Sequence, residues 1–338
     1  MKRYFSHTAL AALLLTVALA GCQREPLPGD GVVIRFSVAS PVISAEETKA
    51  TDPDKPHERT YLVQKTRPVK LFGCSTETGS TERILLFDDV ALSCTDLDTE
   101  KWEYSPLRYW IQDGTHDFRA VFPAPAAGNY SYDKDNDKLD VRFSMGPDDE
   151  LLIASAQSSA ASRTNDKVAL NFQHACAAVR FLFTDGTNEY VLKSFQLENI
   201  TTAGTLSYGS TTTWTPSSTD TKVYPWALSS WAIPPADAQT GEGTAPEGWY
   251  YVIPQDLSAA ANDAAVLSFT YAVGPDATDQ VLPVTLKLNT SGSASNITAW
   301  EAGKIYTYKI NIQANAIDFD VTWTNWVAGH DDFNYIGD

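Results

Sequence analysis

Positive charge is scarce in this chain of 338 residues, in which Lys and Arg number 25 against 42 Asp and Glu, for a formal net charge of −17. A protein that follows a phosphate backbone needs a basic face, so the deficit argues against nucleic acid as a partner. A strongly acidic surface is typical of a secreted, soluble protein that resists self-association. Aromatic residues make up 11% of the chain and charged residues 20%, a composition that can form a hydrophobic core.

Motifs that mark catalytic or metal centres are missing from the sequence. It has no CxxC pair, no cluster of His and Cys, no His pair at helical metal-binding spacing and no GxSxG nucleophile elbow. His174, in "LNFQHACAAV", is interpreted as a partly buried structural histidine rather than a catalytic base. We therefore expect neither an enzyme nor a bound metal or cofactor.

One acidic stretch, "DKDNDKLD", places Asp133, Asp135 and Asp137 at alternate positions, as a calcium loop does. The EF-hand pattern needs Gly at its sixth place and Glu at its twelfth, where this chain has Lys138 and Ser144. The stretch also lies between two segments typical of strands. It is therefore predicted to be a solvated hairpin turn.

Cysteine is also rare, with four residues in all. An exported protein can form disulfides, and Cys74 with Cys94 is the first pair to test for a possible bridge. Cys176 lies in the apolar "HACAAV" and is most simply a buried thiol.

The chain has one long apolar run, residues 8–20, which is too short to span a bilayer as a helix. It follows the positively charged residues Lys2 and Arg3 and fits the core of a bacterial export signal. The quartet "LAGC" at residues 19–22 resembles the lipobox of bacterial lipoproteins, which implies removal of residues 1–21 and acylation of Cys22, for example with palmitate. Residues 22–31 would then be a short lipidated spacer.

Alternation of apolar and polar residues recurs along the chain, whereas long helical periodicity is absent. The fold is therefore predicted to be all-β, with two antiparallel β-sandwich domains at residues 32–165 and 166–338, divided after the polar "SAQSSAASRTNDK". The first and last alternating faces consist of Val32, Ile34, Phe36 and Val38, and of Ile317, Phe319, Val321 and Trp323.

Aromatic residues cluster in "YPWALSSWAIPP" and "EGWYYVIP". Such clusters can form platforms that stack on sugars, but alternating aromatics in a β-sandwich usually fill the core. Core packing is the favoured interpretation, and carbohydrate contact stays open for Trp226, Trp231, Trp249, Tyr250 and Tyr251.

The C-terminal region "NITAWEAGKIYTYKINI" followed by "IDFDVTWTNW" resembles the signature of the fimbrillin family of Bacteroidetes lipoproteins, the type V pilins and their Mfa-like relatives. Two further stretches, "KWEYSPLRYWIQDGTHDFRAVFPA" and "LNFQHACAAVRFLF", resemble the N-terminal and central parts of the same family. The matching residues are Trp102, Tyr104, Pro106, Tyr109, Trp110, Phe118, Phe172, His174, Val179, Phe181, Trp300, Gly303, Lys304, Tyr306, Tyr308 and Trp326. They are fold determinants, a turn glycine followed by a strand with an inward aromatic face, and they identify no reaction.

The resemblance implies two transthyretin-like sandwiches and a pilus subunit that assembles by strand exchange. In that family a protease removes the first strand, here Val32 to Val38, and the vacated groove accepts a C-terminal strand from the next subunit. A cut after a basic residue in positions 40–60 would fall at Lys49 or Arg59, and the sequence does not choose between them. The donor would come from the stretch Ile317 to Tyr335.

The implied partners are other pilus subunits, of the same or a different kind, the outer membrane through the lipid, and a host or bacterial surface ligand. The implied location is the outer face of the outer membrane and the fimbrium. A shaft, tip or anchor role is left open, and the alternative function is a glycan-binding surface lipoprotein that uses Trp226, Trp231 or Trp249.

Overall fold

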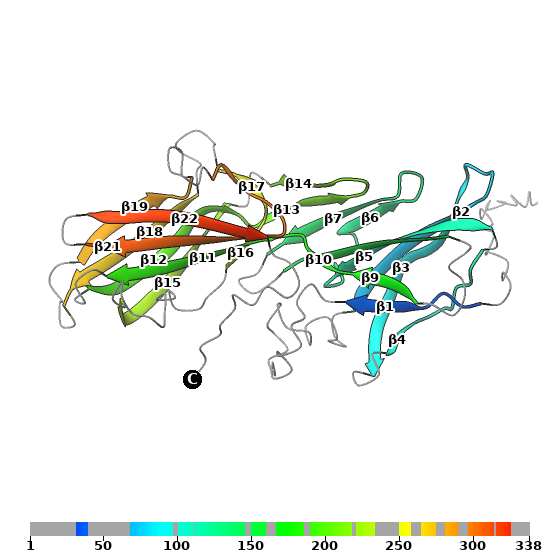
Figure 1. The fold of residues 1–338 in the computed structure, drawn as a ribbon, viewed down its shortest axis with the longest axis horizontal. Coiled ribbons are helices and arrows are strands. Elements are labelled where there is room, and N and C mark those ends of the chain that lie inside the picture. Colours follow the sequence, from blue (N-terminus) through cyan, green and yellow to red (C-terminus); the bar gives the residue numbers. More distant parts are fainter. Residues whose placement is uncertain are drawn as a thin grey trace, which may run out of the picture.

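The computed structural model describes residues 32–39, 68–96, 101–111, 113–145, 150–159, 167–185, 190–217, 221–233, 250–257, 265–274, 281–289, 297–313 and 316–325. Within these ranges every regular element is a strand, so none of them contains a helix that could cross a membrane. The all-β prediction is confirmed. Figure 1 shows an elongated molecule, with the strands of the N-terminal half at one end and those of the C-terminal half at the other.

Three layers form the N-terminal end. The central layer is a six-stranded antiparallel sheet in the order β10-β8-β5-β2-β3-β4, made of Gln173–His174, Leu152–Ser159, Gly114–Phe122, Val69–Glu77, Arg83–Asp96 and Lys101–Tyr104. One face packs on the short pair β1 (Phe36–Ala39) and β9 (Val168–Asn171). The other face packs on the sheet β14-β13-β7-β6, made of Thr212–Pro216, Ala203–Tyr208, Lys138–Ser144 and Tyr130–Asp133.

Strand β2 shows why the central sheet is apolar on both faces. Its Leu71 belongs to the core under β1 and β9, whereas its neighbour Phe72 belongs to the core under β6 and β7. Successive side chains of a strand point to opposite faces, so a strand between two cores must be apolar at consecutive positions. The continuous burial of Leu71 to Ser75 follows from this.

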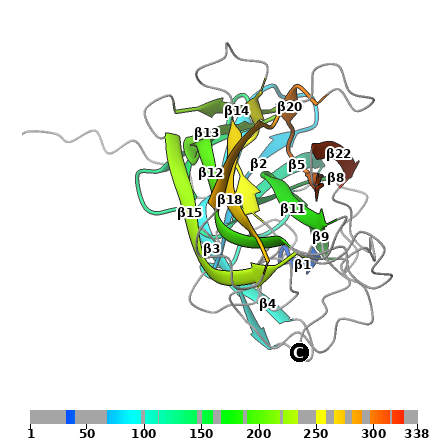
Figure 2. The same ribbon diagram turned by 90° about the vertical axis from the view of Figure 1, so that its left-hand side faces the viewer.

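Two facing sheets form the C-terminal end and enclose an aromatic-rich core (Figure 2). One has the order β16-β11-β21-β22, made of Tyr250–Val252, Ala177–Asp185, Lys304–Ile312 and Ile317–Asn325. The other has the order β15-β12-β18-β19, made of Thr221–Ala232, Tyr190–Thr201, Val266–Val273 and Val281–Lys287. A small pair, β17 (Gln255–Asp256) with β20 (Ala299–Trp300), completes this end. The pairings β1–β9 and β11–β21 are parallel, in contrast to the fully antiparallel sheets expected from the sequence.

The two ends share a sheet and a core. The hairpin β13–β14 lies after residue 165 but pairs with β7, with Tyr208 opposite Leu139. The core beneath it combines side chains from both halves, such as Val121 with Ile305. The boundary near residue 165 stays a prediction, and these contacts show that strands on its two sides are joined by continuous pairing.

The aromatic strand of the C-terminal signature packs as the sequence predicts. Gly303 has a φ of 68°, a left-handed conformation that favours glycine, and its N–H donates to the carbonyl of Cys176 at 2.9 Å. Tyr306 and Tyr308 are buried, and the Tyr308 hydroxyl accepts from Trp300 Nε1 at 2.9 Å and donates to the carbonyl of Leu288 at 3.1 Å. Trp326, the last residue of the signature, lies outside the described residues.

His174, predicted from the sequence to be partly buried, is buried in the structure and contacts the Glu150 carboxylate through Nδ1. His174 ends strand β10 of the N-terminal end, shortly before β11 begins the C-terminal end at Ala177. The carbonyl of the next residue, Ala175, accepts a hydrogen bond from Trp214 Nε1 at 2.7 Å. Burial raises the pKa of Glu150 above its ordinary value, although the neighbouring His174 opposes this shift. Relative to the unfolded state, folding therefore makes ionisation of this carboxyl less favourable.

The acidic stretch is the hairpin turn between β6 and β7, which confirms that prediction. Asp133 caps the turn by accepting from the N–H of Asp135 at 3.0 Å. Asp137 points inward and accepts hydrogen bonds from Arg119 Nη2 at 2.7 Å and from the Tyr132 hydroxyl at 2.8 Å. Its carboxylate thus joins the hairpin to the central sheet.

Cys74 and Cys94 are both buried thiols outside any disulfide, so the bridge considered from the sequence is not formed in this structure. In the β2–β3 register Cys74 lies opposite Leu85, and Cys94 follows nine residues later on β3. At about 3.3 Å per residue this separates them by roughly 30 Å, whereas a disulfide needs Cα atoms within about 7 Å. Cys74 instead accepts a hydrogen bond from Arg83 Nη2 at 2.9 Å, and Cys94 donates to the carbonyl of Asp96 at 3.4 Å.

We predict that the three thiols of Cys74, Cys94 and Cys176 are inert in the folded protein. Burial raises the pKa of Cys74 and of Cys176, so little thiolate is present at neutral pH. A C22S variant treated with Ellman's reagent should show almost no reaction until denaturant is added, and then three thiols. A single thiol after unfolding would mean that two of the cysteines are bridged.

We also predict that the substitution E150Q changes the pH dependence of stability. The raised pKa of Glu150 contributes stability that is present below its ordinary pKa of about 4.5 and is lost as the pH rises through the folded-state value. Between about 4.5 and the folded-state pKa, the variant should gain on the parent by at most about 1.4 kcal/mol per pH unit, the limit for one proton, and above the folded-state pKa the difference should stay constant. Urea unfolding of both proteins from pH 4 to 8 measures this, and parallel curves would contradict it.

Candidate functional site: the first-strand groove

Residues 32–39, here called the first strand, lie in a groove whose two rims come from distant parts of the chain. On one rim the Ile34 N–H donates to the carbonyl of Arg108 at 2.9 Å, and the Trp110 N–H donates to the carbonyl of Val32 at 3.1 Å. On the other rim β1 pairs in parallel with β9, from Phe36 opposite Val168 to Ala39 opposite Asn171. We call this space between β9 and residues 108–110 the first-strand groove.

The floor of the groove is apolar and aromatic. Ile34 and Phe36 are 0% and 2% exposed, and the Phe36 ring packs edge-on against Phe87, Tyr104 and Phe118 at centroid distances of 5.6, 5.8 and 5.3 Å. Val32 and Val38 are half-buried against the same core. The alternating face predicted from the sequence is therefore the face that fills the groove.

Tyr104 holds the first strand by a side-chain hydrogen bond. Its hydroxyl donates to the carbonyl of Ile34 at 2.7 Å, and burial raises the pKa of Tyr104 to about 12. The hydroxyl therefore stays protonated and remains a donor at any physiological pH. Its acceptor is a backbone carbonyl, so this bond does not depend on the side chain of the strand that occupies the groove.

The rims and Tyr104's bond were not foreseen from the sequence. In the segment "KVALNFQH" the apolar residues Val168, Leu170 and Phe172 alternate with polar ones, a pattern that predicts a strand. No local pattern predicts that this strand pairs in parallel with β1. The residues 108–110 lie in an irregular stretch after β4 and make only an isolated bridge, Val33 with Tyr109.

Among the described residues, the first strand has no hairpin partner. The described segment that follows it begins at residue 68, and both rims lie further on. Cleavage between residues 39 and 68 would separate the first strand covalently and leave every other described strand connected. The candidate cleavage residues Lys49 and Arg59 and the lipidation residue Cys22 lie outside the described residues.

Strand β22, which contains the expected donor residues, is paired in its own C-terminal sheet. All nine of its residues pair antiparallel with β21, and β22 forms the edge of that sheet among the described strands. Val321 is buried, Ile317 and Phe319 are half-buried, and Trp323 is 46% exposed with the Lys304 ammonium 4.0 Å from its ring centroid. The last strand is thus packed less deeply than the first.

The aromatic clusters divide between the core and regions that are not described. Tyr250 and Tyr251 are 8% and 7% exposed and belong to two different cores, which confirms the core interpretation for these two. Trp249 lies outside the described residues, and for Trp226 and Trp231 the description covers only the backbone of β15.

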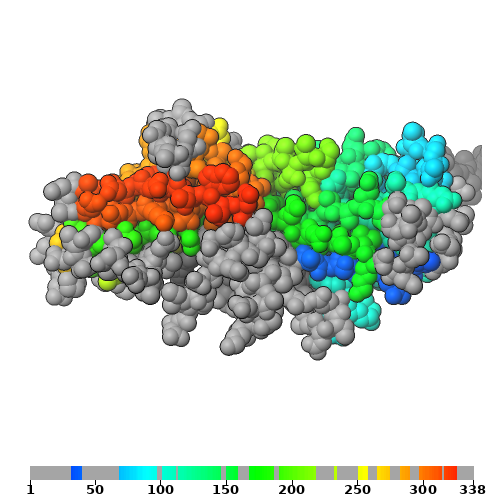
Figure 3. Space-filling model, viewed as in Figure 1, coloured from blue at the N-terminus to red at the C-terminus, as the bar shows by residue number. Residues whose placement is uncertain are grey.

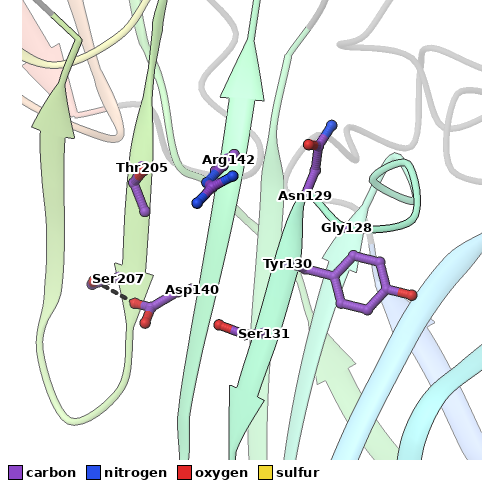
Figure 4. Close-up of a pocket in the computed structure, with 8 residues that line it drawn as sticks. All are labelled: Gly128, Asn129, Tyr130, Ser131, Asp140, Arg142, Thr205 and Ser207. Atoms are coloured by element: carbon purple, nitrogen blue, oxygen red, sulfur yellow. Dashed lines mark hydrogen bonds between the residues drawn. The ribbon is translucent and has the colours of Figure 1, made fainter.

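A shallow depression of about 320 Å³ lies on the outer face of the sheet β14-β13-β7-β6 (Figure 4). Figure 4 shows Ser131, Asp140 and Ser207 next to one another on neighbouring strands, and the Ser207 hydroxyl donates to Asp140. Arg142 and Thr205 form the next row. The depression is open and hydrophilic, unlike the first-strand groove.

We predict that truncating Phe36 destabilises the protein strongly. The substitution F36A removes a fully buried ring from an aromatic core and should lower the free energy of unfolding by about 3–5 kcal/mol. The adjacent R35A change, at an exposed position, should stay within about 0.5 kcal/mol of the parent. Urea unfolding followed by tryptophan fluorescence measures both, and equal effects would show that the first strand is not packed in the groove.

Comparison with known proteins agrees with this architecture. The sequence profile of a family described as fimbrillin-like matches residues 48–326. No curated protein matches the chain. A fimbrial protein from Bacteroides vulgatus ATCC 8482 has a similar structure, with a TM-score of 0.61, 14% identity and coverage of 87% of this chain and 99% of that one.

A second solved structure, that of a candidate cell adhesion protein from Parabacteroides distasonis ATCC 8503, aligns with a TM-score of 0.51 and 10% identity over 88% of this chain and 98% of that one. At such identities the two structures show a shared fold. The profile match, which spans most of the sequence, shows the family: this chain belongs to the fimbrillin-like family.

Proposed function

We propose that this protein is a fimbrial subunit or pilus-associated adhesin, exported as an outer-membrane lipoprotein and assembled by protease-triggered β-strand exchange. Membership of the fimbrillin-like family supports a structural rather than a catalytic role at the cell surface or in the fimbrium. The observation that supports the assembly mechanism is the first strand itself, which closes a hydrophobic core and precedes all other described strands in the chain.

Removal of the first strand would leave a groove with exposed apolar side chains and unpaired backbone groups. The side chains of Ile34 and Phe36 each contribute about 1.5–3 kcal/mol through burial, and the groove would lose both contributions. The rim groups that now bond the strand, such as the carbonyl of Arg108 and the N–H groups of Trp110 and Val168, would lose their partners. An incoming strand with alternating apolar residues restores both kinds of contact, which is the basis of β-strand addition.

Lys49 and Arg59 lie in the chain between the first strand and β2, where a cut frees the strand without dividing the remaining fold. Cys22, in the lipobox, lies ahead of the first strand. A single cleavage would therefore remove the lipid and the strand together. In this proposal the intact form is held at the outer membrane and the cleaved form enters the fimbrium, with other pilus subunits as partners.

We predict that limited trypsin cleavage between residues 39 and 68 converts the purified monomer into ladders that resist SDS. The opened groove should capture a strand from a second molecule, and the resulting core burial should slow dissociation. Gel electrophoresis without boiling, with Edman sequencing of the ladder bands, measures the outcome. A compact cleaved monomer that never forms ladders would refute the shaft role.

Matched variants identify the cut. The substitutions K49Q and R59Q each remove one candidate site, and the one that matters should abolish ladder formation when a protease of matching specificity is used. The N-terminus of protein recovered from the cell surface separates the roles. Acylated Cys22 identifies an anchor or unpolymerised form, and a start near residue 50 or 60 identifies a processed subunit.

A further inference from the structure

His116 is a buried histidine that bonds the backbone beside one rim of the first-strand groove. It lies on β5, and its Nε2 accepts a hydrogen bond from the Ile111 N–H at 3.1 Å. Ile111 directly follows residues 108–110, whose backbone groups bond the first strand. The chain that forms this rim is therefore tied to the central sheet through a titratable side chain.

The rim is anchored on both sides by side-chain hydrogen bonds. Before it, Arg108 Nε donates to the carbonyl of Leu86 on β3 at 2.8 Å, and after it, His116 accepts from Ile111. Between the two anchors the segment is irregular and makes only an isolated bridge with the first strand. An arginine stays charged at any physiological pH, whereas a histidine changes its charge near neutrality. The second anchor is thus the one that pH can alter.

Packing couples the position of the His116 ring to the rim. The Trp110 ring is buried and packs edge-on against the His116 ring at a centroid distance of 4.8 Å. The N–H of the same tryptophan donates to the carbonyl of Val32 at 3.1 Å. A movement of the histidine therefore displaces a backbone donor that holds the first strand.

The contact with Ile111 requires a neutral histidine. An imidazole nitrogen accepts a hydrogen bond only while it carries no proton, so in this contact the proton of the neutral ring lies on Nδ1. Protonation of Nε2 would convert the acceptor into a donor that faces a second donor. The Ile111 N–H would then lose this partner, a change that shifts a local opening equilibrium by about tenfold.

The described residues in register or ring contact with His116 are uncharged. Its register partners are Ser75 on β2 and Ser158 on β8, and the rings of Trp110 and Phe118 pack against it. Asp117, the next residue of β5, points to the opposite face and accepts from Arg83 at 2.6 Å. Charged residues of the surrounding strands and of the turn before β5 are exposed to solvent, namely Arg35, Glu77, Asp113 and Lys167. Because solvent screens exposed charges, protonation of His116 acts chiefly through its contacts with Ile111 and Trp110.

We propose that His116 is a positioning residue for strand binding, whose neutral ring holds residues 108–110 in place and whose protonation loosens this rim. This inference rests on the proposed function and adds a control by pH over how firmly the groove holds a strand. The rim binds the chain's own first strand before cleavage and an incoming strand afterwards, so both bind best when His116 is neutral. Figure 3 shows the blue residues of the first strand at the surface, from where the strand can leave the groove.

Hydrogen exchange in the uncleaved chain with C22S tests this role. The N–H groups of Ile34 and Trp110 report on the rim because each bonds across it, and the amides of β21 report any change in global stability. After correction for the intrinsic exchange rate, protection of the two rim amides should fall by about tenfold in the parent between pH 7.5 and pH 4.5.

Two substitutions form a matched pair of uncharged acceptors. H116Q places an amide oxygen near the position of Nε2, so rim protection should stay high and lose its dependence on pH. H116N carries the same amide on a side chain one methylene shorter, which should not reach Ile111, and it should lower rim protection by about tenfold at every pH. All other titratable groups are shared with the parent, so differences between the profiles belong to His116.

Equal pH profiles for the parent and H116Q would overturn the role of His116, and so would equal rim protection in H116Q and H116N at pH 7.5. Should H116N fail to fold, the comparison of the parent with H116Q decides alone. None of these measurements requires cleavage or assembly.

Ladder formation then shows whether the rim acts in strand exchange. After trypsin cleavage at pH 7.5 and transfer to pH 4.5, the parent should form SDS-resistant ladders about tenfold more slowly than H116Q, whereas at pH 7.5 the two should match. Equal rates at both pH values would overturn the control of capture by pH. Absence of ladders from both proteins under all conditions would contradict strand exchange between copies, and the exchange protection of the uncleaved chain would still decide the role of His116.

Discussion

Ile34 and Phe36 fill the core of the N-terminal end from a strand whose described partners are all distant in the sequence. Both rims of its groove are formed by residues more than 60 positions further on, so its pairing is entirely non-local. Contacts between such distant residues cost loop-closure entropy, so we expect them to form late in folding. Conversely, the strand can be lost without breaking any other connection. The proposed role of the protein depends on this one apolar segment.

A second constraint is the double-sided burial of the central sheet. Because β2 and β5 contribute side chains to cores on both faces, the sheet is held between β1–β9 on one side and β6–β7 on the other. Opening the first-strand groove would expose one core and leave the other covered. The hairpin β13–β14, which covers that second core, also joins the two ends through continuous pairing with β7. An emptied groove is therefore compatible with a chain that stays folded elsewhere.

The sequence predicts much of this from periodicity. Alternation identified the first strand, β22 and the aromatic face of β21, and the composition of "DKDND" identified the hairpin turn between β6 and β7. These features depend on residues close together in the chain. Parallel pairing of β1 with β9, the shared sheet and the wide separation of Cys74 from Cys94 depend on how distant strands align, which no local pattern encodes. Tyr104 lies in the aromatic stretch that resembles the N-terminal part of the family, but only the fold shows its hydrogen bond to Ile34.

In Figure 1 the strands β1 and β22 both run close to the long axis of the molecule. Hydrogen bonds between strands lie roughly across the strand direction. If neighbouring subunits are joined through the first-strand groove and their long axes lie along the fibre, a pull along the fibre slides one strand past its rims and loads all of the cross-strand bonds at once. Such a joint resists traction far better than one peeled open from an end, which suits an appendage that must hold a cell against flow.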